Sequence, residues 1–245
     1  NGGPPRLKCE YISNGEARFR SRQFAGVVAL PDGPLIQISP KAAGENFLYL
    51  LRYSQGATSA TVEEPASFAE GQTFIDALAA LFQAELSAVI DRGLLKEYEQ
   101  VSDAESHVRG RIDLQRQLQR QGPAPTGFEC DYSELTQDTL ANQAVLHAAD
   151  LLTNMTQDEE VVRELQWETA RISRSVSRRV VSPRELDQID LNRLSEHYTD
   201  ILRLTQLVIE SVYIENLEAG RRESASILLN MNTIFERVIE RVLAK

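Results

Sequence analysis

The stretch from Val108 to Val145 constrains the fold more than any other part of the chain. It reads VRGRIDLQRQLQRQ, then a Gly/Pro-rich break, then FECDYSELTQDTLANQAV. The Arg-Gly-Arg at its start predicts a tight turn, because glycine adopts backbone conformations that other residues avoid. Its end predicts a helix that begins near Asp138, since Asp and Thr side chains satisfy the free amides of a first turn. We therefore expect a β-type protrusion that is anchored by a helix.

Residues 6–40 have the composition of strands. Residues 23–30 are rich in β-forming side chains, Pro31-Asp32-Gly33-Pro34 is a strong turn signal, and residues 35–38 alternate apolar with polar. This pattern predicts a β-hairpin. Further strand-like pieces flank the Arg-Gly-Arg turn, over residues 94–98, 107–114 and 128–132.

Apolar residues recur at helical spacing through the rest of the chain. The spacing predicts helices over residues 44–54, 70–92, 137–155, 158–173 and 223–243. Ser182-Pro183-Arg184-Glu185 predicts another helix start, in which Glu185 reaches back to the Ser182 amide. That helix is expected to continue to about residue 218, with a break at residues 190–192. Asn142 flanks the apolar face of its helix, where it can tie a neighbouring loop.

These patterns together predict an α+β fold. We expect a β-rich N-terminal region over residues 1–43. A mainly helical region follows over residues 44–220 and carries the β protrusion near residues 94–132. A final helix covers residues 221–245. It is amphipathic, with its apolar residues in register: Ile227, Leu228, Met231, Ile234, Phe235, Val238, Ile239 and Val242.

Composition excludes several classes of protein. No apolar run approaches the ~20 residues that span a bilayer, so no membrane association is expected. The N-terminus lacks both Met and the apolar core of a signal peptide, and we interpret it as a fragment boundary. Cys9 and Cys130 are too few for a disulfide framework, which favours a reduced, cytoplasmic setting. The net charge of −10 means that the surface as a whole does not attract nucleic acid.

The sequence predicts no catalytic or metal site. His107, His147 and His197 have no metal-ligand spacing, and there is no phosphate-binding loop, nucleophile elbow or HExxH motif. None of the four lysines lies two positions after an acidic residue within a β-type run; they are Lys8, Lys41, Lys96 and Lys245. Metal-dependent nucleases need that arrangement, so we expect this chain to be inactive by itself.

Two basic features have two interpretations each. Arg109-Gly110-Arg111 is either a solvent-exposed turn or a pair of guanidinium forks for the carboxylates or phosphates of a partner. The segment 171–184 has no acidic residue and contains Arg171, Arg174, Arg178, Arg179 and Arg184. One interpretation is a patch that binds the nucleic-acid backbone or the acidic surface of another protein. The other is a linker whose arginines pair with nearby Asp and Glu. It has no aromatic residue on which a base could stack.

Several segments, in the same order, resemble McrC proteins, the partner subunits of the McrB GTPase in modification-dependent restriction. They are ISPK at 38–41, FLYLLRY at 47–53, VRGRID at 108–113, CDYSELTQDTLAN at 130–142 and LNMNTIFE at 229–236. The resemblance covers residues 26–245.

The resemblance implies a two-part protein. Its first part docks on an McrB-type AAA+ hexamer, reaches into the central channel and stimulates hydrolysis of GTP, which the partner binds. Its second part is a PD-(D/E)xK endonuclease that cuts DNA with Mg²⁺, and no position here matches that signature. We therefore expect a motor-engaging part without a cofactor of its own, with Arg109, Gly110 and Arg111 toward the partner and residues 221–245 leading into a missing nuclease domain. DNA binding through Arg171, Arg174, Arg178 and Arg179 is the alternative.

Overall fold

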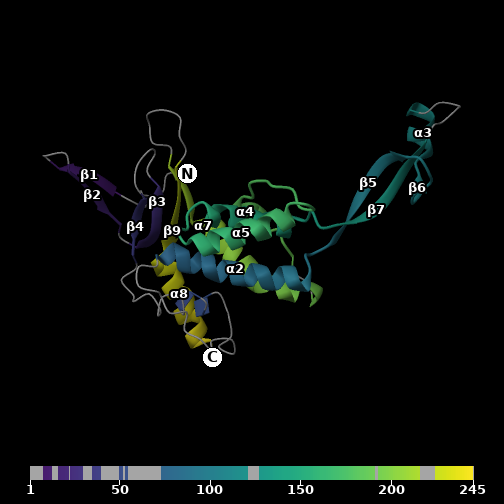
Figure 1. The fold of residues 1–245 in the computed structure, drawn as a ribbon. Coiled ribbons are helices and arrows are strands. Elements are labelled where there is room, and N and C mark those ends of the chain that lie inside the picture. The colour runs from purple at the N-terminus through teal and green to yellow at the C-terminus, as the bar shows by residue number, and fades with distance from the viewer. Residues whose placement is uncertain are drawn as a thin grey trace.

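The computed structural model describes residues 8–12, 16–21, 23–29, 35–39, 50–51, 53–54, 73–120, 127–190, 193–215 and 224–244. A helical body lies in the middle, with β-sheet at one end and a long hairpin that projects from the other (Figure 1). The predicted α+β fold with a protruding β segment is confirmed.

The helices of the described residues are α2 (Phe74–Arg92), α3 (Leu114–Arg120), α4 (Leu140–Thr153), α5 (Glu159–Ile172), α6 (Pro183–Leu186), the 3₁₀ helix η2 (Arg193–Tyr198), α7 (Thr199–Ser211) and α8 (Met231–Leu243). The strands are β1 (Lys8–Ile12), β2 (Glu16–Arg20), β3 (Phe24–Ala29), β4 (Leu35–Ile38), β5 (Glu97–Glu105), β6 (Arg111–Ile112), β7 (Phe128–Thr136), β8 (Val212–Glu215) and β9 (Ser224–Asn230). The helices predicted around residues 70–92, 137–155 and 158–173 are confirmed.

Helix α4 is the centre of the body, because it packs against α2, α5 and α7. Large apolar side chains from these four helices are fully buried around it: Phe82, Leu86, Leu146, Leu152, Leu165 and Ile201. Each contributes about 1.5–3 kcal/mol by leaving water. The body is therefore rigid enough to position the elements that emerge from it.

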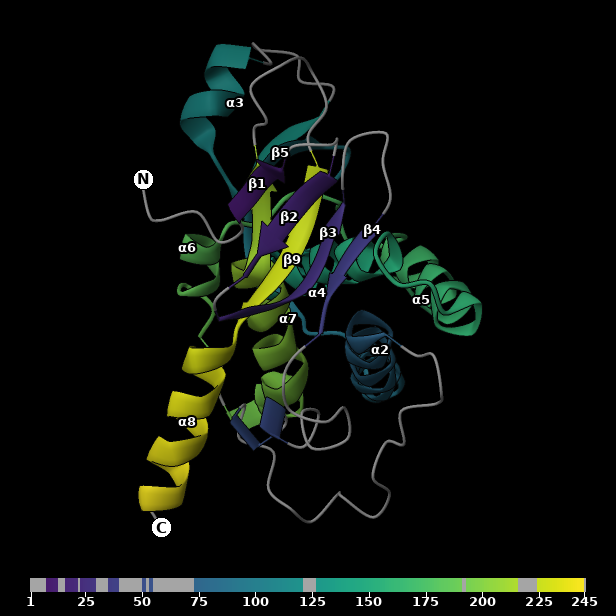
Figure 2. The ribbon, with the colours of Figure 1, turned by 90° about the vertical axis from the view of Figure 1, so that its left-hand side faces the viewer.

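Strand β9 sits inside a four-stranded sheet of order β4-β3-β9-β8, and it pairs antiparallel with both neighbours. Figure 2 looks onto this sheet, with β9 in yellow beside β3. Ile227, Leu228 and Leu229 are all buried. The prediction of a helix from residue 223 is therefore wrong for residues 224–230. An unbroken apolar run suits a strand covered on both faces as well as a buried helix.

The last helix begins at Met231, where the Asn230 side chain accepts a hydrogen bond from the Asn232 amide at 3.1 Å. Its apolar side is only partly covered. Only Ile234 is buried, whereas Phe235 and Ile239 on the same helix are 40% and 55% exposed.

The helix predicted from Ser182 to about residue 218 is shorter than expected. The Glu185 carboxylate accepts from the Ser182 amide at 2.8 Å, as predicted. However, α6 ends at Leu186, η2 and α7 follow the expected break, and residues 212–215 form strand β8. Strands β3 and β4 pair as the predicted hairpin. The turn at residues 31–34 lies outside the described residues, as does the predicted helix at 44–54 except for residues 50–51 and 53–54, which are helical.

Asp76 ties the start of α2 to the connection between α4 and α5. Its carboxylate accepts from the Thr73 amide at 2.8 Å, from the Thr156 hydroxyl at 2.6 Å and from the Gln157 amide at 2.7 Å. Burial by itself raises the pKa of Asp76, but these hydrogen bonds outweigh it and leave the pKa below its ordinary value of 3.8. The charged form is therefore the one that stabilises the fold.

We expect Asp76→Asn to lower the free energy of unfolding by about 1.5–3 kcal/mol, because hydrogen bonds to a charged acceptor are lost. A folded pKa below the unfolded value gives stability that is present above pH ~4 and is lost as the pH falls through the folded pKa. Urea denaturation between pH 7 and pH 2 measures both effects. Asp91→Asn, at the exposed end of the same helix, is the matched control. Equal stabilities of the two variants at pH 7 would contradict the role of Asp76.

Candidate partner interface

The projecting hairpin is the most distinctive feature of the structure. Strands β5 and β7 pair antiparallel along nine residues, from Glu97↔Thr136 to Glu105↔Phe128, and β6 adds a short third strand. We call β5, β6, α3 and β7 together the finger (Figure 1). No residue of β5 is buried. Strand β7 buries Glu129, Cys130 and Tyr132. A ribbon with so small a core is marginally stable, so the finger depends on the contacts at its two ends.

Helix α3 is docked at the outer end of the finger through polar contacts. Arg116 pairs with Asp113 at 2.8 Å and also with Asp131 on β7. Gln117 donates to the Gly127 carbonyl at 2.9 Å and accepts from the Glu129 amide at 2.7 Å. These contacts hold one side of α3 against β7, and the charges at the tip are partly neutralised within the finger.

Gly110 makes the turn that the sequence predicted. Its φ of +68° lies in the left-handed region, and a Cβ atom there would lie 2.5 Å from the Asp131 carbonyl oxygen. Both facts require glycine, because an L side chain is strained at that φ and has no space at that distance. The turn directs the chain back along β7, so Arg109 and Arg111 lie on either side of Gly110.

The structure separates the roles of the two arginines. The guanidinium of Arg109 lies 4.0 Å from the centre of the Tyr132 ring and pairs with Glu134 at 3.4 Å. The side chain of Arg109 thus makes its contacts within the finger. Arg111 is exposed, and none of the ion pairs among the described residues involves it. Of the predicted pair, Arg111 is the side chain that is available to a partner.

Sequence reasoning missed the apolar part of the tip. The strand predicted over residues 107–114 is confirmed only at β6, residues 111–112, and helix α3 follows from Leu114. The two leucines of this helix, Leu114 and Leu118, are 69% and 75% exposed. Val108 nearby is 51% exposed. The spacing of four between two leucines in a Gln- and Arg-rich segment was the available signal for a helix. We call Val108, Arg111, Leu114 and Leu118 the tip surface. Exposed apolar groups at the end of a projection favour a contact with a partner.

The inner end of the finger is fixed by a buried hydrogen-bond cluster, which we call the root cluster. Asn142 on α4 donates from Nδ2 to the carbonyl of Leu95 at 2.9 Å and to that of Gln137 at 2.7 Å. The Tyr198 hydroxyl donates to Asn142 Oδ1 at 2.6 Å and accepts from the Leu95 amide at 3.0 Å. Both are almost completely buried. Leu95 precedes β5 and Gln137 follows β7, so one amide holds both strands.

The prediction that Asn142 ties a neighbouring segment is confirmed, whereas Tyr198 was not foreseen. Burial raises the pKa of Tyr198 to about 12. The hydroxyl therefore keeps its proton at neutral pH and can donate it to Asn142.

The model of the family of McrBC 5-methylcytosine restriction system components matches residues 19–245. The chain belongs to this family. The match confirms the resemblance inferred from the sequence, and comparison with curated proteins finds no match.

Two solved structures have a similar fold. The Thermococcus gammatolerans McrBC complex contains a chain with a TM-score of 0.65 and 20% identity, and the alignment covers 94% of this chain and 68% of that one. A half-complex from a tetradecameric assembly of T. gammatolerans McrB AAA+ hexamers with bound McrC gives a TM-score of 0.66 and 19% identity. There the alignment covers 96% of this chain and 55% of the other, so the chain spans about half the length of that relative.

The basic segment of this McrBC-family chain lies along α4. Arg178 pairs with Asp150 at 2.5 Å, and Arg179 pairs with Glu185 at 2.7 Å. The Ser177 hydroxyl donates to Asp138 at 2.6 Å. Arg171 and Arg174 are exposed and take part in none of the ion pairs among the described residues. Two of the four arginines of the nucleic-acid hypothesis are thus already paired, which favours the linker interpretation for them.

His147 has a structural role, because its Nδ1 accepts from the Val181 amide at 3.2 Å and burial lowers its pKa. Within the described residues, no three His, Cys, Asp or Glu side chains gather as metal ligands. No helix in that part of the chain is long and apolar enough to cross a membrane.

We expect Tyr198→Phe to loosen the root of the finger, because it leaves the Leu95 amide and Asn142 Oδ1 without their partner. The cost is about 1–3 kcal/mol for buried groups left unpaired. Amide hydrogen exchange at Leu95 should accelerate, while exchange in the centre of α4 changes less. Tyr98→Phe is the control, since Tyr98 is 74% exposed. Unchanged exchange at Leu95 would rule out the root cluster as the anchor.

Proposed function

We propose that this chain is the McrC-type subunit of its restriction system, and that its finger enters the channel of an McrB-type AAA+ ring and stimulates GTP hydrolysis there. The observation that carries the proposal is the finger itself, which is anchored at the root by hydrogen bonds from the buried Asn142 side chain and exposes Arg111, Leu114 and Leu118 at its far end. The similar fold in a structure of McrB hexamers with bound McrC supports it.

The dimensions of the finger suit entry into a channel. Nine residues of β-strand extend over roughly 30 Å, at about 3.4 Å per residue. A ribbon of two to three strands is narrow, and the exposed groups along it can contact the wall of the channel. The polar faces of such a ribbon need no covering when the finger is free in water.

In this proposal the chain contributes position and charge, and the partner holds GTP. The exposed guanidinium of Arg111 can meet a carboxylate or phosphate on the ring with two parallel hydrogen bonds. Leu114 and Leu118 add apolar contact beside it. Coupling to DNA cleavage requires a nuclease domain with Mg²⁺, whose signature this sequence does not carry.

The proposal is tested by mixing the chain with its cognate McrB-type ring and measuring GTP turnover and co-elution. Stimulated turnover together with a stable complex is the expected result. A ring whose turnover does not change, and that does not retain the chain on a sizing column, would reject the proposal.

We expect Arg111→Ala and Leu118→Ser each to lower the stimulation about tenfold, equivalent to ~1.4 kcal/mol of lost interaction. Both side chains are exposed, so the free energy of unfolding should stay within about 0.5 kcal/mol of the parent. Arg184→Ala, an exposed arginine on the body, is the matched control. If the control lowers the stimulation as much as the tip variants do, the finger is not the contact.

A further inference from the structure

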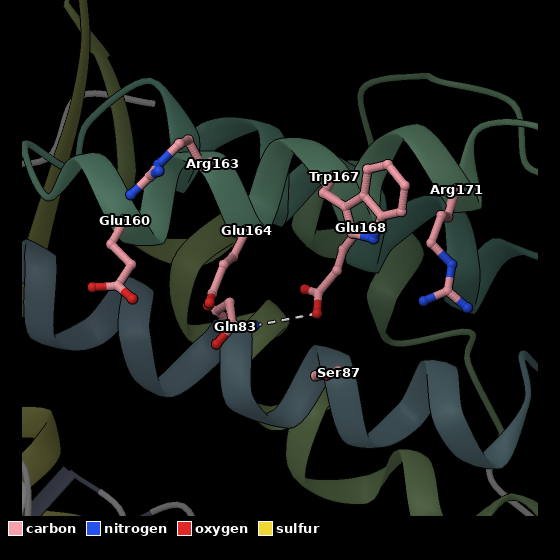
Figure 3. A pocket seen from close by; sticks show the side chains of 8 residues that line it. All are labelled: Gln83, Ser87, Glu160, Arg163, Glu164, Trp167, Glu168 and Arg171. Atoms are coloured by element: carbon pink, nitrogen blue, oxygen red, sulfur yellow. Dashed lines mark hydrogen bonds between the residues drawn. The ribbon is translucent and has the colours of Figure 1, made fainter.

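A groove lies between α2 and α5, and Figure 3 shows the side chains that line it. Its volume is about 460 Å³, within the range of roughly 300–1,000 Å³ that is typical of ligand sites. Gln83 and Ser87 of α2 line one wall, and side chains of α5 line the other. We call this hollow the α2–α5 groove.

Three glutamates of α5 form a row in this groove. Glu160, Glu164 and Glu168 are four residues apart, so they lie on one side of the helix, and Figure 3 shows them hanging toward α2. Like charges at this spacing disfavour a helix. Arg163 and Arg171 also line the groove, yet no ion pair within 4.0 Å among the described residues joins any of the five. The exposed carboxylates of Glu160 and Glu164 therefore remain available to a cation from outside, whereas Glu168 is buried and already lies in the field of Arg171.

Glu168 is the deepest of the three and is incompletely satisfied. It is 6% exposed, and its Oε1 accepts from Gln83 Nε2 at 3.2 Å, whereas Oε2 is buried without a hydrogen-bond partner. Burial raises the pKa of Glu168, and nearby Ser87 and Gln83 oppose that rise only in part. An added donor at Oε2 would complete the site and stabilise the charge.

Trp167 stands beside this row, and 66% of it is exposed. It is the one tryptophan in the sequence. The indole ring is the best aromatic partner for a cation, and tryptophan is enriched among the residues that dominate binding interfaces. An exposed indole lies next to a carboxylate that has one oxygen without a hydrogen bond. A guanidinium suits both, because its plane can stack on the indole while its N–H groups donate to the carboxylate.

We propose that the α2–α5 groove is a docking site for a protein segment that inserts an arginine side chain between Trp167 and the carboxylates of Glu164 and Glu168. The guanidinium donates to the exposed carboxylate of Glu164 and, once the Glu168 carboxylate turns toward the groove, to Glu168 Oε2, and the indole covers its face. Arg163 and Arg171 meet acidic residues that flank the arginine of the partner. Single-stranded nucleic acid could stack a base on Trp167, but the three carboxylates oppose its phosphates.

The emission of Trp167 reports on this site alone, because the chain has no other tryptophan. The probe is an acetylated, amidated heptapeptide with a central arginine flanked by aspartates. A second peptide carries citrulline, which has the same shape without the charge, in place of the arginine. We expect a saturable change in emission with the arginine peptide, confirmed by calorimetry, and a dissociation constant about tenfold higher with citrulline.

Glu164→Gln and Glu168→Gln keep the side-chain size, and each should lower the affinity for the arginine peptide about tenfold. Glu240→Gln removes the same charge from the exposed face of α8 and should leave the affinity unchanged. Thermal melting of each variant establishes that it is folded, and the Glu164 variant serves if the buried Glu168 position does not tolerate the change.

Three results would overturn the proposal. The first is the absence of a saturable response to the arginine peptide, and the second is equal affinity for the citrulline peptide. The third is a saturable response to oligothymidylate that Arg163→Ala abolishes and Glu164→Gln does not, which would assign the groove to single-stranded nucleic acid. None of these experiments depends on a GTPase partner, so their failure is separate from failure of the proposed function.

Discussion

The buried amide of Asn142 is the interaction on which the arrangement of the molecule depends. It holds the carbonyls of Leu95 and Gln137, the residues where the chain leaves and re-enters the body, and Tyr198 holds the amide in turn. The side chains of Asn142 and Tyr198 are almost completely buried, so an unpaired polar group on either would be costly. The direction of the finger is therefore set by a cluster on α4 and η2, and not by packing along the finger.

The finger shows how a thin element persists with only a small hydrophobic core, formed by Cys130 and Tyr132. Its root is fixed by buried hydrogen bonds, and its tip is closed by the contacts of Arg116 and Gln117 with the end of β7. Between these ends β5 buries no residue, and β7 buries Glu129, Cys130 and Tyr132. Because the finger projects from the body, the exposed leucines of α3 lie away from the core, which would otherwise cover them.

Local patterns predicted much of this structure. The helix start at Asp138–Asn142 and the glycine turn at Gly110 follow from capping and from backbone sterics, which depend on a few adjacent residues. Strand β9 could not be distinguished from a helix, because its partners β3 and β8 are chosen by tertiary contacts that a single apolar run does not encode. The different roles of Arg109 and Arg111 depend on Tyr132 and Glu134, which approach only once β7 has folded back. The groove beside Trp167 likewise exists only because α2 and α5 pack together.

The pairing of β3 with β9 joins Phe24 to Asn230, two residues from near the opposite ends of the sequence. Contacts between such remote segments carry a large loop-closure cost and form slowly. On the ribosome, β3 emerges early and has only β4 and other nearby segments to pair with until residue 230 has left the exit tunnel. One edge of a strand rich in valine stays unpaired during that interval, and an unpaired edge is a template for pairing with other chains. The order of synthesis thus makes the N-terminal sheet the part of this protein that most needs protection while it is being made.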